Sequence, residues 1–521
     1  MKKSSLWLSA AGALVIAVAL AGCGQTYYFA GRVLPPSGLT NRVMVAIQNP
    51  GALSRGALEI MDGFYDVRFK YNNPNIAFSI SGFSGALPVT IQNMPEEQLG
   101  AVYGSGDNTF TMVDYQKEDS GGGQTGLNGE SSSVFITRNQ KYVFAASQVS
   151  HVLTVIDRAL GGSYALNLPD IYRVSVNPGG TVAMAFVQNS NYAYYPIKLD
   201  SAQTLSYSGG PTTWPKAAVD CEPLNAPGWC LFQAQSPDHP DPLYGNTGLY
   251  YGAPLVFDRP IKAVFSNDGG MAYVLNCGPE CGGAASSISL LPTGPMIFAP
   301  NQTSGVLPSN AALQAACGSA AHLSACTLAV PGGASNALVD SSTMYVVGQC
   351  AAAKTLTNDG LPQCAAISSS APLFTGSLTV LNLAGSSSAT VTAGGTTSIS
   401  DGAPGAMSRI IEADDNTLWI GMTKCTNGER FAASAKGGYG CLTMYDTSKG
   451  AVTMIEPYQG DATGIAAVTS LHKVYVAEGG QVYVYATTDG RALNNQYVTV
   501  TGTAYDVAYI DGLSDANNTV Y

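Results

Sequence analysis

Four histidines are the first candidates for chemistry, because histidine is the side chain that most readily exchanges a proton near neutral pH. They are His151, His239, His322 and His472. None lies in an HExxH, HxH or similar ligand spacing, so the sequence predicts no metal site and no cofactor. His151 follows a predicted strand and its short loop, and it is the one candidate catalytic residue; an exposed loop histidine is the alternative interpretation.

Two acidic segments place oxygen ligands close together in the sequence. Asp238 and Asp241 flank His239, and the segment Glu412–Asn416 holds three carboxylates. A bound cation is one interpretation of each, and a solvated turn or a hairpin turn is the other. No GxSxG elbow, phosphate loop or dinucleotide fingerprint occurs in the chain. The sequence therefore contains no motif that identifies an enzyme.

Ten further cysteines follow Cys23, and they fall into neighbouring pairs along the chain. Outside the cytoplasm an even number of cysteines is typical of disulfides, although the sequence alone does not establish which cysteines pair. The expected pairs are Cys221/Cys230, Cys277/Cys281, Cys317/Cys326, Cys350/Cys364 and Cys425/Cys441. Zinc binding is the alternative, but these spacings match no familiar zinc pattern.

One pattern of strands recurs along the chain and must position these residues. In Ile171–Leu199 an alternating strand leads through the turn Asn177–Gly180 to a second strand and then a third. The same order recurs in Ile261–Leu291. Period-two alternation with Gly, Asn and Asp turns is typical of antiparallel hairpins, and hairpins that recur every 40 to 75 residues or so are typical of propeller blades.

We therefore expect an all-β fold, a single β-propeller over residues 41–521 with insertions at 201–260 and 293–334. Seven blades are favoured and eight are possible; a tandem of β-sandwiches is the alternative. The expected blades start near residues 65, 134, 172, 262, 335, 408 and 465. The strand-like segments Arg42–Ile47 and Ala504–Tyr509 are expected to pair and close the ring, which removes two open sheet edges.

The strands themselves resemble a known repeat. Lys141–Ser147 followed by Leu153–Asp157 resembles the YVTN repeat of bacterial surface propellers and lactonase-like propellers. Similar fragments are Tyr345–Gly348 and Val474–Ala477. The resemblance implies a propeller fold, but it implies little about function because propellers serve as binders, scaffolds and enzymes.

One face of the expected propeller carries more elaborate loops than the other. Loops between second and third strands share a face with the connections between blades. The cysteine pairs that begin at Cys277, Cys350 and Cys425 would each staple such a loop, and His151 lies in another. Function is expected on this face. Aromatic residues near the 201–260 insertion are expected either to stack on sugars or partner proteins or to pack against the propeller. They are Tyr192, Tyr194, Tyr195, Trp214, Trp229, Tyr244, Tyr250 and Tyr251.

The N-terminus has the layout of a secretory signal peptide, with two lysines before the apolar run Leu6–Ala21. Its ending, Leu20–Cys23, resembles the lipobox of bacterial lipoproteins. The resemblance implies that residues 1–22 are a signal peptide, that Cys23 carries the lipid anchor, and that residues 23–40 form a tether. A transmembrane anchor is the alternative, but the run is shorter than the roughly 20 apolar residues that span a membrane. By the same resemblance, Gly24 after the cysteine favours the outer membrane.

Charge and composition exclude some partners. Without residues 1–22 the chain has 22 Lys and Arg against 35 Asp and Glu, a formal charge of about −13, and it has no basic cluster. DNA and RNA are therefore excluded as partners.

Three functions remain. The favoured one is a non-catalytic binding or scaffold module for a protein, glycan or envelope component. The others are a propeller enzyme, a lactonase-like hydrolase or lyase, and a structural subunit of an envelope assembly. Several buried carboxylates at the mouth of the channel would indicate the enzyme.

Overall fold

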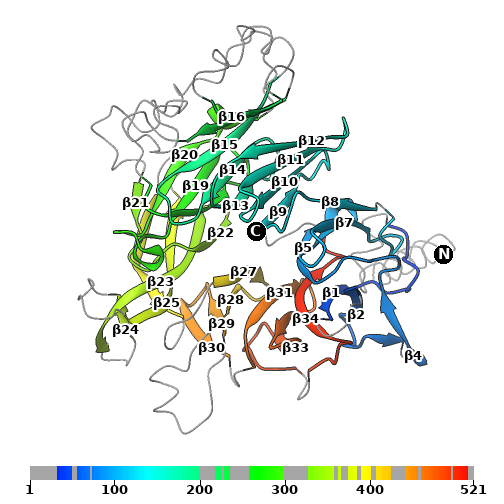
Figure 1. Cartoon of the computed structure of the whole chain (residues 1–521). Coiled ribbons are helices and arrows are strands. Elements are labelled where there is room, and N and C mark those ends of the chain that lie inside the picture. Colours follow the sequence, from blue (N-terminus) through cyan, green and yellow to red (C-terminus); the bar gives the residue numbers. More distant parts are fainter. Residues whose placement is uncertain are drawn as a thin grey trace, which may run out of the picture.

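The structure is a computed structural model, and it describes most of the chain after residue 31. The described residues are 32–49, 55–70, 73–121, 123–199, 218–223, 228–234, 257–298, 327–356, 362–364, 373–383, 389–399, 407–423, 441–455, 459–493 and 497–513. These residues form eight antiparallel sheets arranged as the blades of a propeller (Figure 1). No helix among them is long and apolar enough to cross a membrane.

Each blade is numbered here along the chain, with its strands given from the channel outward. Blade 1 has β34 (Thr503–Tyr509), β1 (Arg42–Gln48), β2 (Ala57–Asp62), β4 (Asn73–Ser79) and β3 (Phe69–Lys70). Blade 2 has β5 (Pro88–Met94), β6 (Leu99–Gly104), β7 (Thr109–Asp114) and β8 (Gln124–Gly126). Blade 3 has β9 (Ser133–Ile136), β10 (Tyr142–Ser147), β11 (Val152–Asp157) and β12 (Gly162–Asn167). Blade 4 has β13 (Ile171–Val176), β14 (Ala183–Val187), β15 (Ala193–Lys198), β17 (Trp229–Gln233) and β16 (Ala218–Glu222).

The remaining blades follow the same order. Blade 5 has β18 (Pro260–Phe265), β19 (Met271–Asn276), β20 (Ser287–Pro292) and β21 (Thr327–Ala329). Blade 6 has β22 (Asn336–Asp340), β23 (Thr343–Leu356), β25 (Leu373–Leu383) and β26 (Ala389–Ser398), with β24 (Pro362–Cys364) beside β23. Blade 7 has β27 (Met407–Ala413), β28 (Thr417–Met422), β29 (Leu442–Asp446) and β30 (Ala451–Met454). Blade 8 has β31 (Ala462–Val468), β32 (Lys473–Glu478) and β33 (Gln481–Ala486). Three short 3-10 helices are η1 (Pro95–Glu97), η2 (Gly278–Cys281) and η3 (Gly294–Met296).

The two ends of the described chain close the ring in one shared blade, as predicted. β1 pairs with β34 in antiparallel register, and Figure 1 shows the blue and red strands side by side. β34 is the innermost strand, since it contacts β31 and β5, the first strands of the neighbouring blades. The preference for seven blades was wrong. The expected start near residue 65 lies in the outer part of blade 1, and blade 2 begins at Pro88. The shared blade 1 is therefore present in addition to seven blades that each come from one continuous segment.

Local turn chemistry explains the hairpins. In the turn after β13, the Asn177 side chain accepts hydrogen bonds from the backbone N–H groups of Thr181 and Val182, and Gly180 has a φ of 61°. Asp415 and Asn416, between β27 and β28, both have positive φ, at 62° and 56°. Two consecutive positive φ angles are typical of a tight hairpin turn. The acidic segment is therefore a hairpin turn.

The hydrophobic core consists of layers between neighbouring blades. Trp229, with 1% of its surface exposed, packs edge-on against Tyr142 and Phe144 of blade 3 and also contacts Phe298. Tyr194 and Tyr195 are also buried. Packing within the propeller, not stacking on a ligand, therefore explains Trp229, Tyr194 and Tyr195. Trp214, Tyr244, Tyr250 and Tyr251 lie outside the described residues.

The propeller has two distinct faces. We call the face with loops between second and third strands the loop face; it also carries the connections between blades. The opposite side, with turns between first and second strands, is the turn face. The Arg32 guanidinium donates to backbone carbonyls of Pro95, Asp511 and Gly512, which all lie on the turn face. The first described residues therefore leave the propeller from the turn face.

Candidate functional site

A cavity of about 340 Å³ opens on the loop face, where the first strands of blades 4 to 7 begin. Its volume lies at the lower end of the range for small-molecule sites. It is lined by the start of β13, the loop 187–190, residues 259–261, the loop 277–281, Ser335 and Met407. The site thus unites four blades that are far apart in sequence.

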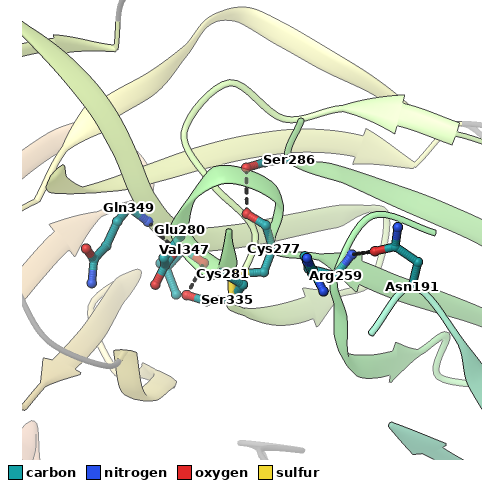
Figure 2. Close-up of a disulfide and its surroundings, with 9 residues drawn as sticks. All are labelled: Asn191, Arg259, Cys277, Glu280, Cys281, Ser286, Ser335, Val347 and Gln349. Carbon is teal, nitrogen blue, oxygen red and sulfur yellow. Dashed lines mark hydrogen bonds between the residues drawn. A yellow bond between two sulfur atoms is a disulfide. The ribbon is translucent and has the colours of Figure 1, made fainter. Parts of the chain in front are cut away.

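A disulfide holds one wall of the cavity (Figure 2). Cys277 follows β19 directly, and its bond to Cys281 closes the one-turn helix η2 in the loop between the second and third strands of blade 5. The Ser286 hydroxyl donates to the Cys277 carbonyl at 2.9 Å, and the Cys277 N–H donates to the Arg259 carbonyl at 2.9 Å. Gly278 adopts a φ of 61°, which glycine tolerates without strain. The wall is therefore ordered.

Glu280 contributes the one carboxyl group among the described lining residues. One of its carboxyl oxygens accepts the backbone N–H of Gln349 in blade 6, at 2.9 Å. Burial disfavours the charged carboxylate and raises the pKa of Glu280 to about 7. Close to neutral pH this group is therefore partly protonated.

Two arginines line the cavity and carry hydrogen-bond donors that have no acceptor in the described part of the chain. Arg259 donates to the carbonyl of Asn189, but its Nε is buried and has no partner among the described residues. Arg173 lies over the ring of Tyr172, 5.7 Å from the ring centroid, and makes no ion pair within the described part of the chain. The hydroxyl of Tyr172 is also buried without a described partner.

Three basic side chains, Arg173, Lys262 and Arg409, lie on the first strands of blades 4, 5 and 7. Lys262, 5% exposed, donates its ammonium group to the Asn336 side chain at 2.8 Å. Burial, together with the positive charges of Arg173 and Arg409, lowers the pKa of Lys262 to about 7. Arg409 pairs with Asp506 at 2.7 Å. Of these three basic side chains, Arg409 alone has a carboxylate partner within the described part of the chain.

The candidate residue His151 lies in the loop between β10 and β11, where the sequence placed it. Its side chain is 57% exposed, and its Nδ1 accepts the backbone N–H of Asp170 at 3.3 Å. It does not line the cavity. His472 lies on the turn face, with its Nδ1 2.9 Å from Asp415. His239 and His322 are outside the described residues.

Two of the expected cysteine pairs form disulfides in the structure, Cys277–Cys281 and Cys221–Cys230. The second joins directly opposed residues of β16 and β17, at the outer edge of blade 4. Cys441 is also disulfide-bonded. The other pairings stay predictions. Cys23, Cys317, Cys326 and Cys425 lie outside the described residues, as do the side chains of Cys350 and Cys364. No cluster of metal-binding side chains occurs within the described ranges.

The site residues that sequence reasoning missed carry a weak common signal. Arg173, Lys262 and Arg409 each lie five residues before the turn that follows a first strand, which begins at Pro178, Asn267 and Asp414. In each of the three blades the pairing register shifts immediately before the basic residue. Such β-bulges redirect side chains. Glu280 and Arg259 have no comparable signal.

Comparisons with known proteins show similarity at the level of the fold. No family model and no curated protein sequence matches the chain. A putative 6-phosphogluconolactonase from Bacteroides fragilis aligns over 90% of this chain and 97% of its own, with 9% identity and a TM-score of 0.45. The periplasmic gluconolactonase of Pseudomonas aeruginosa aligns over 90% of this chain and 98% of its own, with 14% identity and a TM-score of 0.33. Hydrazine synthase from Kuenenia stuttgartiensis aligns over 78% and 99%, with 13% identity and a TM-score of 0.40. At these values the similarity indicates no ligand and no reaction.

Proposed function

We propose that this chain is an exported propeller, anchored by lipid on Cys23, that binds a small ligand or the end group of a larger one without chemical conversion. The cavity of about 340 Å³ on the loop face carries this proposal. Its wall is held by a disulfide and by hydrogen bonds between blades, so the site exists before the ligand arrives. A preformed site loses little conformational entropy on binding.

The geometry supports an arrangement in which the anchor and the ligand site lie on opposite faces of the propeller. Arg32 leaves the propeller from the turn face, and the cavity opens on the loop face. A tether over residues 23–40 would therefore hold the turn face toward the membrane, with the cavity directed away from it. In this arrangement the outer membrane stays the favoured location.

The anchor is tested by the change Cys23→Ser in the full chain. We expect loss of incorporated fatty acid and release from the membrane fraction, because two or three acyl chains are needed for stable anchoring. Labelling with a radioactive fatty acid and fractionation of cells measure both effects. Persistent labelling of the variant would disprove lipidation at Cys23.

The binding function is tested with a panel of organic acids, sugars, amino acids and short peptides, scored by thermal stabilisation of the mature protein. Gln188 is exposed and lines the cavity, so Gln188→Trp should fill it and abolish the stabilisation. Lys141→Trp, on the exposed turn face, is the matched control and should respond like the native protein.

Each outcome decides the proposal. Ligands that stabilise the native protein and the control, and that are recovered unchanged after incubation, support it. A chemically altered ligand would show the enzyme alternative instead, and a panel without any stabilising member, or equal stabilisation of Gln188→Trp, would refute binding at this cavity.

A further inference from the structure

We infer that the cavity selects a small ligand with a carboxylate group on an apolar body, the carboxylate bound by Arg173 and Arg259. This inference rests on the proposed binding function and adds the chemical class of the ligand. It starts from hydrogen-bond donors that have no acceptor among the residues that the structure describes.

The unsatisfied groups are all hydrogen-bond donors or can act as donors. Two of them, the Nε of Arg259 and the hydroxyl of Tyr172, are buried without a partner among the described residues. The third is the half-buried guanidinium of Arg173, for which the described part of the chain offers no acceptor. Leaving a buried donor unpaired is unfavourable, so a ligand that supplies acceptors gains affinity here. An ionised carboxylate consists of two acceptor oxygens and carries no donor, and guanidinium groups bind it well.

The charge distribution favours an anion over a neutral acceptor. Behind the cavity, the ammonium group of Lys262 has an amide oxygen as its partner and no carboxylate among the described residues, whereas Asp506 is already paired with Arg409. A buried positive charge without a counter-ion is unfavourable, and a bound anion nearby offsets it.

The carboxyl group of Glu280 does not repel a carboxylate that is bound by the two arginines, because it lies elsewhere in the cavity. Figure 2 shows Glu280 and Arg259 on opposite sides of the Cys277–Cys281 disulfide. The Glu280 carboxyl group is oriented toward blade 6, where it accepts the N–H of Gln349. The carboxylate of the ligand is therefore expected at the arginine side.

The rest of the lining suits an apolar body. Val187, Pro260, Ile261 and Met407 contribute hydrocarbon surface, and the disulfide adds its sulfur atoms. Burial of such surface contributes about 25 cal/mol per Å². A carboxylate with a small ring or a short chain satisfies both halves of the site, whereas inorganic anions satisfy the arginines alone.

The inference is tested by isothermal titration of the mature protein with phenylacetate and with phenylacetamide, which has nearly the same shape without the charge. The native protein should bind phenylacetate at least about tenfold more tightly, the effect of one charge-assisted hydrogen bond. Arg173→Gln should remove this preference. Arg173→Lys should keep part of it, because it keeps the charge but not the two-pronged geometry.

The matched control is Arg158→Gln, which removes one positive charge from the turn face and should keep the preference. If both probes bind the native protein equally, or if neither binds at millimolar concentration, the carboxylate assignment is wrong. Equal binding that Gln188→Trp abolishes would leave the proposed binding function intact, so the two proposals fail separately.

Discussion

At the scale of single residues, the cavity and the channel behind it contain ionisable groups that the fold keeps in an unfavourable environment. Glu280 and Lys262 are both desolvated, and each has a shifted pKa as a result. Such shifts are typical of functional sites, and they also make stability depend on pH.

For Glu280 the folded-state pKa of about 7 lies above the usual value of 4.5. The folded protein therefore binds this proton more tightly than the unfolded chain, and the resulting stability is lost as the pH rises from about 4.5 to 7. Glu280→Gln should remove this loss, up to about 3 kcal/mol of the free energy of unfolding between pH 5 and pH 8. Urea unfolding at several pH values measures it. The exposed Glu130→Gln is the control, and an unchanged pH profile in Glu280→Gln would contradict the prediction.

For Lys262 the direction is opposite. Its folded-state pKa of about 7 lies below the usual 10.5, so the native protein gains stability as the pH rises from about 7 to 10. Lys262→Met should be more stable than the native protein at pH 7, by about 1 to 4 kcal/mol, as when buried ionic groups are replaced by apolar ones. The advantage should shrink toward pH 10. A variant less stable than the native protein at pH 7 would show that the ammonium group is favourably placed.

At the scale of elements, two disulfides of the described chain lie in different positions relative to the cavity. Cys277–Cys281 staples a loop that lines the cavity, and Cys221–Cys230 joins a hairpin at the edge of blade 4. Both restrict the unfolded chain, but only the first shapes the candidate site.

Replacing both cysteines of either pair by serine should therefore separate stability from binding. The loops that are closed are short, and chain entropy predicts a loss of about 2 to 3 kcal/mol in either variant. Only Cys277→Ser/Cys281→Ser should also weaken binding of phenylacetate. Chemical denaturation and titration measure the two effects. Equal affinities in the two variants would show that the loop keeps its shape without the staple.

At the scale of the whole molecule, one buried arginine links the closing blade to its neighbour. Arg42, fully buried in β1, pairs with Asp511 beyond β34 at 2.6 Å and with Glu118 beyond β7 at 2.9 Å. Arg42 and Asp511 belong to the two ends of the described chain, and Glu118 belongs to blade 2. The ion pairs of Arg42 therefore stabilise the closed ring.

Arg42→Met should destabilise the protein by about 3 to 5 kcal/mol, because two buried carboxylates lose their counter-ion. The triple change Arg42→Met/Glu118→Gln/Asp511→Asn should recover part of this loss, since it leaves no buried charge. Guanidinium unfolding compares the three proteins. A loss below about 1 kcal/mol in Arg42→Met would indicate that water reaches these carboxylates and that the closure does not depend on the arginine.

The sequence by itself determined the features that depend on neighbouring residues. Period-two alternation predicted the strands, the turn residues around Asn177 and Asp415 predicted the hairpins, and the position of Cys277 directly after a strand predicted the stapled loop. The pairing of β1 with β34 was also predictable, because each end offered a single unpaired strand pattern. These features arise from local sterics and hydrogen bonding.

Only the tertiary structure decided the number of blades and the site. Blade 1 combines strands from both ends of the described chain, and a count of internal repeats omits a blade that no continuous segment forms. The cavity joins Arg173, Arg259 and Glu280 across blade interfaces. Their spatial proximity depends on the closure of the ring and on β-bulges that redirect side chains, and neither is encoded by residues close in sequence. For the same reason His151 could be placed on the correct loop by its sequence and still lie outside the cavity.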